Sequence, residues 1–279
     1  MSELSERKLE LRILGTAAAE GWPGLFCQCE SCQRARQLGG KDVRSRSGAL
    51  LGKAYKIDLP PDTYHHALQH GLELWAVDHL LVTHAHQDHF YPDDLLLLRP
   101  PYAHRTEERL LHVYGDAHVK KSLDRAVPDW ESGFIRFHLV RAFETFTAGE
   151  LEVTPLPADH FPEKSAFLYH IRCGARQLFW GLDSGWYPEE TWGFLERTSL
   201  NLAVIDCTYG PLPVQSNHLN VEGVKAVRER LLRCGAADLR TSFVATHFSH
   251  NGGLSHRQLE EVFASPEIRV AFDGFSCEF

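Results

Sequence analysis

Three features that mark membrane, secreted or nucleic-acid-binding proteins are missing from this sequence. No apolar run approaches the ~20 residues that a membrane-spanning helix needs, and the charged first ten residues are unlike a secretion signal. The formal net charge of −8 leaves no basic surface for an extended polynucleotide. We therefore expect a cytoplasmic protein that acts on neither membranes nor nucleic acids.

Long linkers, low-complexity tracts and internal repeats are also missing. At 279 residues with 43% hydrophobic content, the chain can bury one large core, and we expect a single domain over residues 1–279. Apolar periodicity predicts strands at 8–14, 48–58, 111–114, 135–140, 151–156, 166–173, 177–182, 202–206 and 268–272. It predicts helices at 63–74, 93–98, 117–126, 188–197, 220–232 and 255–263, the last beginning with a Ser255–Gln258 capping box. Two strand-rich halves, each followed by helices, indicate an α/β fold, a β-sandwich flanked by helices (αββα).

The most informative stretch is Thr-His-Ala-His-Gln-Asp-His at 83–89, directly after the apolar run 80–82. It places four metal-capable side chains within six positions: His84, His86, Asp88 and His89. No regular element points all four the same way, so they converge only in a tight loop. Imidazoles that converge with a carboxylate indicate a bound cation. The alternative is a solvated His-rich loop, which the preceding strand disfavours.

Three more polar residues stand where strand-like segments end. His160 follows segment 151–156, Asp183 ends the apolar run 178–182, and His247 ends the run 243–246. Carboxyl ends of strands are where α/β folds build their sites. Taken singly, each residue is equally well explained as a local cap or turn. Together they are candidates for the remaining ligands of a metal centre.

Seven cysteines are present, and three of them cluster as Cys27, Cys29 and Cys32. Disulfides within so tight a group would be strained, and we expect a reducing compartment. Thiolates at this spacing provide three ligands of a structural zinc site, and His250 is the best candidate for the fourth. A loop of free thiols is the alternative. The other cysteines are expected to be ordinary apolar residues: Cys173, Cys207, Cys234 and Cys277.

The pattern His-x-His-x-Asp-His at 84–89 resembles the signature of the metallo-β-lactamase superfamily. The resemblance implies that fold's αββα sandwich, with two metal ions at one edge. It also implies a ligand scheme in which one ion takes His84, His86 and His160, the other takes Asp88, His89 and His247, and Asp183 bridges both.

Further motifs extend the resemblance over nearly the whole chain. They are Cys-x-Cys-x-x-Cys (27–32), Arg-x-Arg-Ser-Gly (44–48), Val-Thr-Pro-Leu-Pro-x-x-His (153–160), Asp-Cys-Thr (206–208), Asn-His-x-Asn (217–220) and Thr-His-x-Ser-His (246–250). This series is similar to the cyclic phosphodiesterases of the carbon–phosphorus lyase (phosphonate) pathway, which act on 5-phosphoribosyl 1,2-cyclic phosphate. Relatives with these motifs include uncharacterised hydrolases and the pyrroloquinoline-quinone biosynthesis protein B group.

The resemblance implies hydrolysis of a small phosphate ester by a hydroxide that two divalent metal ions activate. The His/Asp shell suits Zn²⁺ and also Mn²⁺, whereas the thiolate site should select zinc. Asp88 and His218 are the catalytic candidates, with His218 serving the leaving group. A surface histidine before a helix is the alternative for His218. Arg44, Arg46 and Ser47 either bind a substrate phosphate or form a solvated strand edge.

Two other functional classes stay open at this stage. One is a hydrolase of the same superfamily that cleaves another ester, a thioester or a lactam. The other is a non-hydrolytic metalloprotein of cofactor biosynthesis or of metal or redox sensing, which would carry the thiolate zinc without the metal pair. The sequence also leaves the oligomeric state open, with a homodimer among the options.

Overall fold

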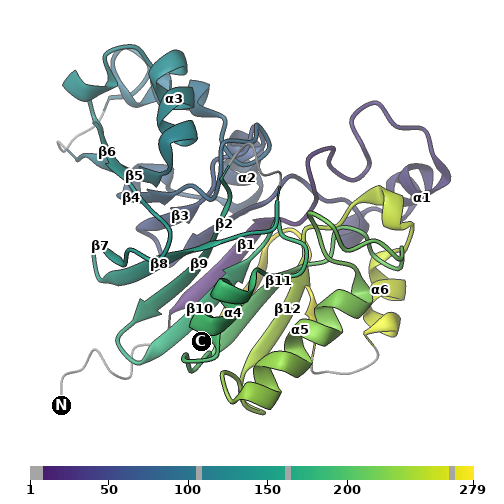
Figure 1. Ribbon diagram of the computed structural model, residues 1–279. Helices are drawn as coiled ribbons and strands as arrows, with labels where there is room; N and C mark the ends of the chain where they lie inside the picture. The colour runs from purple at the N-terminus through teal and green to yellow at the C-terminus, as the bar shows by residue number, and fades with distance from the viewer. Residues whose placement is uncertain (1–8, 105–108, 161–164, 264–267) are drawn as a thin grey trace.

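The computed structural model describes residues 9–104, 109–160, 165–263 and 268–279, so Lys8 of the first predicted strand lies outside it. In this part of the chain the strands form two seven-stranded sheets (Figure 1). The first sheet runs β14 (Phe275–Glu278), β1 (Glu10–Gly15), β2 (Gly48–Leu51), β3 (Tyr55–Ile57), β4 (His79–Leu81), β5 (Leu111–Gly115) and β6 (Ile135–Leu139). The second runs β13 (Ile268–Val270), β12 (Ser242–Thr246), β11 (Leu202–Asp206), β10 (Arg176–Gly181), β9 (Phe167–Cys173), β8 (Leu151–Pro157) and β7 (Phe146–Ala148).

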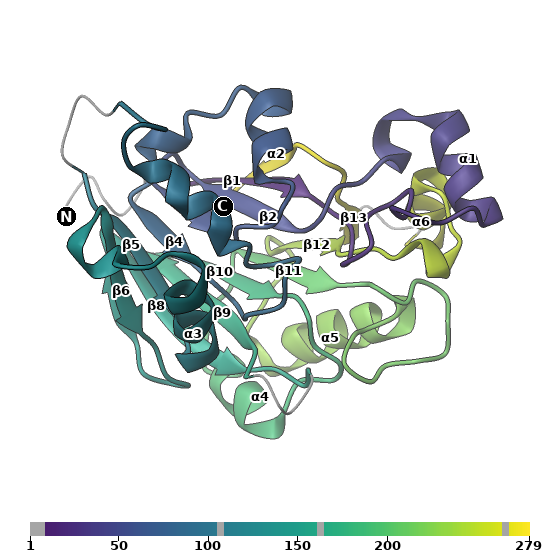
Figure 2. The ribbon, with the colours of Figure 1, turned by 90° about the horizontal axis from the view of Figure 1, so that it is seen from above.

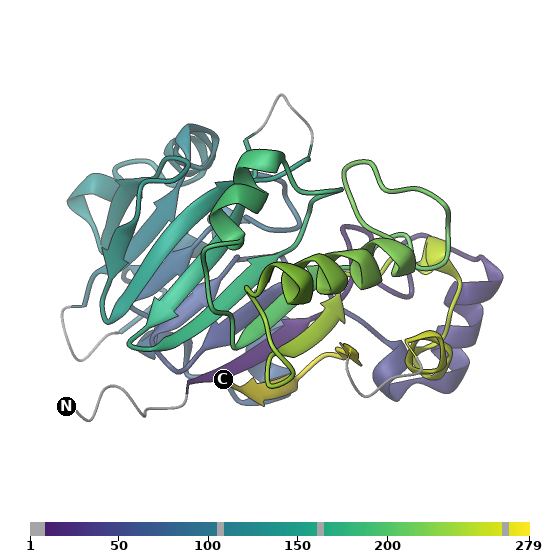
Figure 3. The same ribbon diagram turned by 60° about the horizontal axis from the view of Figure 1, so that its bottom comes forward.

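Helices cover the outer faces of the paired sheets. They are α1 (Glu30–Leu38), α2 (Thr63–His70), α3 (Ala117–Ala126), α4 (Glu189–Leu195), α5 (Val221–Cys234) and α6 (His256–Val262). Figure 2 places α2 and α5 on opposite sides of the sheets, while α1 and α6 lie together at one end (Figures 1 and 3). The predicted α/β class and αββα arrangement are therefore confirmed. No helix in the described ranges is long and apolar enough to cross a membrane.

Alternating side chains divide the interior into three apolar layers. Between the sheets, residues such as Ile13, Leu81 and Trp180 are fully buried, because successive strand side chains point to opposite faces. Outside the second sheet, an apolar stripe of α5 packs against β10–β12: Val221, Val224, Val227 and Leu231. Outside the first sheet, α3 buries Val119 and Leu123 against β4 and β5.

Three sequence predictions of secondary structure need correction. Segment 48–58 is not one strand but the hairpin β2–β3, because Gly52 has φ +58°, a turn conformation that glycine adopts without strain. Helix α2 ends at His70, before the predicted end at Leu74, because Gly71 is left-handed at its C-terminus. Segment 92–98 is a 3₁₀ helix, η4 (Pro92–Leu98).

Other short elements were not predicted. They are α1, β7, β14 and the 3₁₀ helices η2 (Gly40–Asp42), η3 (Leu74–Ala76), η5 (Trp130–Ser132) and η6 (His250–Gly252). Helix α1 is polar and begins at a cysteine, since the Cys29 side chain accepts a hydrogen bond from the Cys32 amide. By contrast, the Ser255–Gln258 capping box of α6 is present as predicted.

Strand direction gathers the candidate site at one edge of the second sheet. Strands β10, β11 and β12 are parallel, so their carboxyl ends meet. Strand β8 runs in the same direction because it pairs antiparallel with β9, which pairs antiparallel with β10. The loop after β4 reaches the same edge, where the Phe167 amide donates to the Thr83 carbonyl at 3.0 Å. Five loops therefore meet at one edge of the sandwich.

Candidate metal centre

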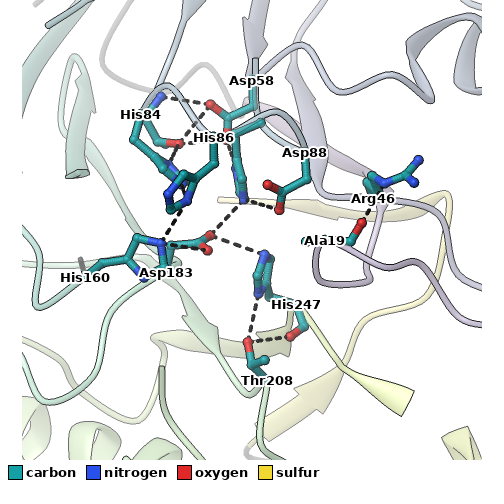
Figure 4. Close-up of polar contacts among 12 residues, drawn as sticks. Ala19, Arg46, Asp58, His84, His86, Asp88, His160, Asp183, Thr208 and His247 are labelled. Atoms are coloured by element: carbon teal, nitrogen blue, oxygen red, sulfur yellow. Dashed lines mark hydrogen bonds and ion pairs between the residues drawn. The ribbon is translucent and has the colours of Figure 1, made fainter. Parts of the chain in front are cut away.

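Three imidazoles from two of these loops converge on one point. His84 Nε2 lies 2.9 Å from His86 Nδ1, which lies 3.2 Å from His160 Nε2. All three ring nitrogens lie within 4.8 Å of one another, as the ligands of a single cation do. Figure 4 shows His86 and His160 facing each other from the loops that follow β4 and β8.

A second group lies beside the first, with a carboxylate between the two. It contains Asp88, His89 and His247, whose ligand atoms also lie within 4.8 Å of one another. Asp183 Oδ2 is 3.1 Å from His89 Nε2 and 3.2 Å from His247 Nε2, while its Oδ1 is 3.8 Å from His160 Nε2. One carboxylate therefore faces both groups (Figure 4).

The spacings in the two groups run from 2.9 to 3.8 Å and bracket those between the ligands of a bound cation. Nitrogen or oxygen ligands about 2.0–2.2 Å from a tetrahedral ion lie about 3.3–3.6 Å apart. The side-chain atoms His89 Nε2, His247 Nε2 and Asp183 Oδ2 are buried and have no hydrogen-bond partner. Buried polar atoms without partners are costly, and a cation between them would satisfy all three.

The second nitrogen of three ligand histidines, His89, His160 and His247, is held by a hydrogen-bond partner. His89 Nδ1 donates to Asp58 Oδ2 at 2.7 Å, and His160 Nδ1 donates to the Asn217 carbonyl at 3.1 Å. His247 Nδ1 lies 2.8 Å from Thr208 Oγ1. Each contact leaves Nε2 for the metal and fixes the ring plane, as is usual around metal-binding histidines. Asp58, which directly follows β3, therefore orients the His89 ring.

The backbone at the site is strained where these side chains are presented. Asp58, Asp183, Asn217 and His247 all have φ between 55° and 63°. This left-handed region is uncommon for residues other than glycine, and such strain clusters at functional sites. Gly185 allows the loops to approach, because a Cβ there would lie 2.4 Å from the Gln215 carbonyl oxygen.

The carboxylates of the second group favour protonation of the histidines that would bind a cation. Burial alone lowers the pKa of His89, but the carboxylates of Asp183, Asp88 and Asp58 raise it well above its ordinary value. Burial raises the pKa of Asp183, but the nearby His247 and His89 lower it by more. The net result is a pKa well below the usual range of an aspartate. Cation binding would therefore displace protons from these imidazoles.

His218 lies next to both groups but is held by a different carboxylate. Its Nδ1 is 2.9 Å from Asp206 Oδ2 and 4.0 Å from Asp183 Oδ1. Burial lowers the pKa of His218, but Asp206 raises it to about 9. Asp206 was assigned no role from the sequence, although it ends strand β11 just as Asp183 follows β10. The same strand-end signal would have identified it.

A separate sulfur cluster lies at the end of the molecule that holds α1 and α6. Cys27, Cys29, Cys32 and His250 place their ligand atoms within 4.8 Å of one another. His250 Nδ1 is 3.8 Å from Cys27 Sγ and 3.5 Å from Cys29 Sγ. Zinc bound to sulfur at about 2.3 Å and nitrogen at about 2.0–2.1 Å sets these atoms about 3.6 Å apart. None of the seven cysteines, all of which lie in the described ranges, forms a disulfide.

The surroundings of this cluster suit thiolate ligands. The Cys32 amide hydrogen bond, despite opposing burial, lowers the pKa of Cys29 to about 6. Burial raises the pKa of Cys32 to about 11, so this ligand would lose its proton on metal binding. Glu20 Oε1 lies 3.6 Å from His250 Nε2 and orients the ring from the far side. Sequence analysis missed Glu20.

The predicted phosphate-binding residues do not face the metal ligands. Arg44 is 2% exposed, donates to the Ala271 carbonyl at 2.7 Å, and has its guanidinium 4.5 Å from the centre of the Phe248 ring. Ser47 is also buried. Arg46 binds Asp62 at 3.1 Å, and its guanidinium points away from the cluster (Figure 4).

Arg44 is therefore neither a substrate contact nor part of a solvated strand edge, and both alternatives are wrong for it. Its donors are used inside the protein, where burial lowers its pKa to about 10. Ser47 is closed to a substrate, and the direction of Arg46 removes it from the metal centre.

Comparison with known proteins identifies the family. The family model described as the beta-lactamase superfamily domain matches residues 60–248, more than half of the chain. The chain belongs to this superfamily. No curated protein sequence matches the chain.

Solved structures of the β-lactamase superfamily share this fold over nearly the full length. A diphosphatase of the PhnP family has a TM-score of 0.75 at 22% identity, covering 98% of both chains. Zn²⁺-bound PqqB from Methylobacterium extorquens has a TM-score of 0.73 at 15% sequence identity, and the match covers 97% of this chain and 100% of that one. The short form of human tRNase Z has a TM-score of 0.64 at 16% sequence identity, and the match covers 96% of this chain and 98% of that one. At these identities the likeness shows the fold alone.

As a β-lactamase-superfamily member, the chain has the fold and metal-ligand clusters of a metal-dependent hydrolase. The buried His/Asp clusters are consistent with a dinuclear metal site, and the Cys/His cluster with a structural zinc ion.

Cys29→Ser is expected to remove the zinc ion and to destabilise the protein. Fully loaded wild-type protein should hold about three ions per chain, and the variant about two. The loss of zinc should also lower stability, because the free energy of zinc binding contributes to folding. Each kcal/mol lost lowers Tm by about 2–4 °C at this size, so we expect a fall of about 5 °C or more. The turnover of folded protein should change less. Elemental analysis and thermal melts measure both.

Cys234→Ser is the matched control, because this half-buried thiol at the end of α5 bonds only locally, to the Leu231 carbonyl. It should leave metal content unchanged. A wild type that holds two ions or fewer when fully loaded would contradict the separate zinc site.

Asp58→Asn is expected to weaken binding at the metal group that contains His89. Asparagine tolerates the positive φ of Asp58 but lacks the charge that orients and polarises His89. Loss of such a partner typically costs about 10–100-fold in metal affinity. Competition with a chelator measures it. Asp129→Asn, at φ 60° but outside every ligand cluster, should have no effect, and an equal effect of both variants would contradict the assignment.

Proposed function

We propose that this chain is a metal-dependent phosphodiesterase that hydrolyses a small cyclic phosphate, such as phosphoribosyl 1,2-cyclic phosphate. The observation that carries the proposal is the position of His218 beside the complete set of dinuclear ligands. Its ring centre is 5.0 Å from that of His160 and 5.5 Å from that of His247. A candidate acid thus adjoins both metal groups, as an in-line displacement at phosphorus needs.

Two bound divalent ions, held by the seven ligands above, would supply a nucleophile at neutral pH and Lewis-acid stabilisation of the phosphoryl oxygens. Asp183 would set their separation and offset their repulsion. With Nδ1 held by Asp206, His218 is left with Nε2 to donate a proton to the leaving alkoxide. Its raised pKa supports the protonated form that this role requires.

A cavity beside the metal ligands supports a small substrate. His160 lines a space of about 500 Å³ together with Arg141, Phe167 and Asp116. This volume is within the range of small-molecule sites. Arg141 would provide a positive charge for a second anionic group of the substrate. The net charge of −8 argues against a polynucleotide substrate, although tRNase Z shares the fold.

The test is a substrate panel assayed with the protein as purified and after reloading with Zn²⁺ or Mn²⁺. We expect turnover of bis-(p-nitrophenyl) phosphate and of a ribose 1,2-cyclic phosphate, and little turnover of lactones or β-lactams. A diphosphate ester belongs in the panel because the PhnP-family neighbour is a diphosphatase. Faster cleavage of a lactone, thioester or lactam would contradict the phosphodiesterase proposal. Purified protein with zinc on the thiolates but no metal pair would favour a non-hydrolytic role.

A further inference from the structure

A fully buried lysine lies on the far side of the first sheet from the metal ligands. Lys56, in β3, is 2% exposed, and its Nζ donates to the Asp58 carbonyl at 2.7 Å. Among the described residues it forms no ion pair, and burial lowers its pKa to about 8 against the attraction of the Asp58 carboxylate. The amine packs against Gly48, where a Cβ would lie 3.4 Å from Nζ. A buried ammonium with one hydrogen bond and no counter-ion is costly.

This lysine lines a cavity that is otherwise mainly apolar. The cavity has a volume of about 600 Å³ and lies between α2, η3, η4 and the outer face of β3–β5. Its wall is formed by aliphatic side chains: Leu59, Leu74, Val77, Leu80, Leu95, Leu98 and Leu111. Tyr64, Trp75 and Leu97 line it while 70%, 62% and 51% exposed, so they mark its mouth. None of the metal ligands lines it.

We propose that this cavity binds a lipophilic carboxylate, with the carboxylate on Lys56 and the apolar chain directed towards Trp75 and Leu97. The volume is in the range of small-molecule sites, and the lining combines apolar walls with one deep charged donor. An anion would supply the missing counter-charge and take up the free donors of Nζ. Asp94 also lines the cavity, and burial together with Asp93 raises its pKa, which reduces its repulsion of an anion.

Asp58 connects this cavity to the metal centre. Its carbonyl accepts from Lys56, and its carboxylate accepts from His89 and from Thr83 Oγ1 at 2.9 Å. The cavity and one metal group therefore share a single strained residue. A ligand in the cavity would act on this metal group through Asp58 and His89. Its binding can be measured without turnover.

The test is calorimetric titration of the metal-loaded protein with octanoate and with octan-1-ol, which differ in the head group. Octanoate should bind about ten-fold or more tightly than the alcohol, because a charge-assisted hydrogen bond is the stronger one. In Lys56→Met the octanoate affinity should fall about ten-fold or more, while the alcohol affinity changes little. Lys53→Met, which alters an 88% exposed side chain three residues earlier, should change neither.

Two further measurements keep the result interpretable. Lys56→Met should melt no lower than wild type, since it removes an uncompensated buried charge. Trp75→Ser should weaken both ligands, because it shortens the apolar wall at an exposed position. Equal binding of octanoate and octan-1-ol by wild type, no binding of either, or unchanged octanoate binding by Lys56→Met would overturn the proposal. Self-association abolished by Trp75→Ser, without octanoate binding, would assign the surface to a second copy and overturn it too.

Discussion

Replacing Asp183 by alanine is expected to release at least one ion of the metal pair and to abolish nearly all turnover. Asp183 is the only carboxylate among the described residues that faces both ligand groups. Without it, two cations held about 3.5–4 Å apart would repel each other with no bridging charge between them. The metal content of dialysed protein should drop by about one or two ions per chain, with the zinc ion retained.

The fold should survive this change. The Asp183 side chain contributes nothing to the apolar layers, and its Oδ2 has no hydrogen-bond partner. Alanine at φ 55° adds strain, so Asp183→Asn is the matched variant, because asparagine tolerates this conformation. Both variants should lose metal and activity, while circular dichroism and Tm stay close to wild type. If Asp183→Asn keeps both ions and normal turnover, the carboxylate does not bridge and the loss in alanine reflects strain.

The metal ligands could be predicted because they follow a local rule. Each of these candidates lies in a loop that follows a buried strand, and strand direction brings such loops to one edge without further information. Asp58 also follows a strand, β3, and it orients His89. Asp206 obeys the rule as well, but nothing near it in the sequence indicates that its partner is His218, twelve residues later.

The role of Arg44 could not be predicted, because its environment is assembled from distant segments. Its guanidinium contacts Thr16, Ala271, His256 and the ring of Phe248, which come from both ends of the chain. A sequence with two arginines near a strand looks the same whether they point outwards or inwards. The same holds for Lys56, which is buried beside a cavity that residues of α2, η3 and η4 line. Charged residues in short strands are placed by packing, which local patterns do not encode.

His218→Ala should leave the metal content and substrate affinity near wild type while kcat falls about 10²–10⁴-fold on a substrate with an alkyl leaving group. The reason is that His218 belongs to neither of the two ligand groups described above: its ligand atom clusters with those of Asp183, Asp206 and His247, and Asp206 holds its Nδ1 at 2.9 Å. An alkoxide is a poor leaving group that needs the proton, whereas p-nitrophenolate leaves with little help. The loss on bis-(p-nitrophenyl) phosphate should therefore be small, and the ratio of the two losses measures acid catalysis.

The pH dependence gives an independent check on this assignment. A general acid acts in its protonated form, so the wild-type rate on the alkyl substrate should fall as pH rises through the pKa of His218. Burial lowers the pKa of His218, but Asp206 raises it to about 9. Bound cations would lower this pKa again, so the rate should fall at or below about pH 9. Asp206→Asn should move this limb to lower pH, because the carboxylate that favours the imidazolium is gone. His65→Ala, at an exposed position of α2, should not move it. Equal rate losses on both leaving groups, with an unchanged pH limb in Asp206→Asn, would reduce His218 to a structural neighbour of the metals.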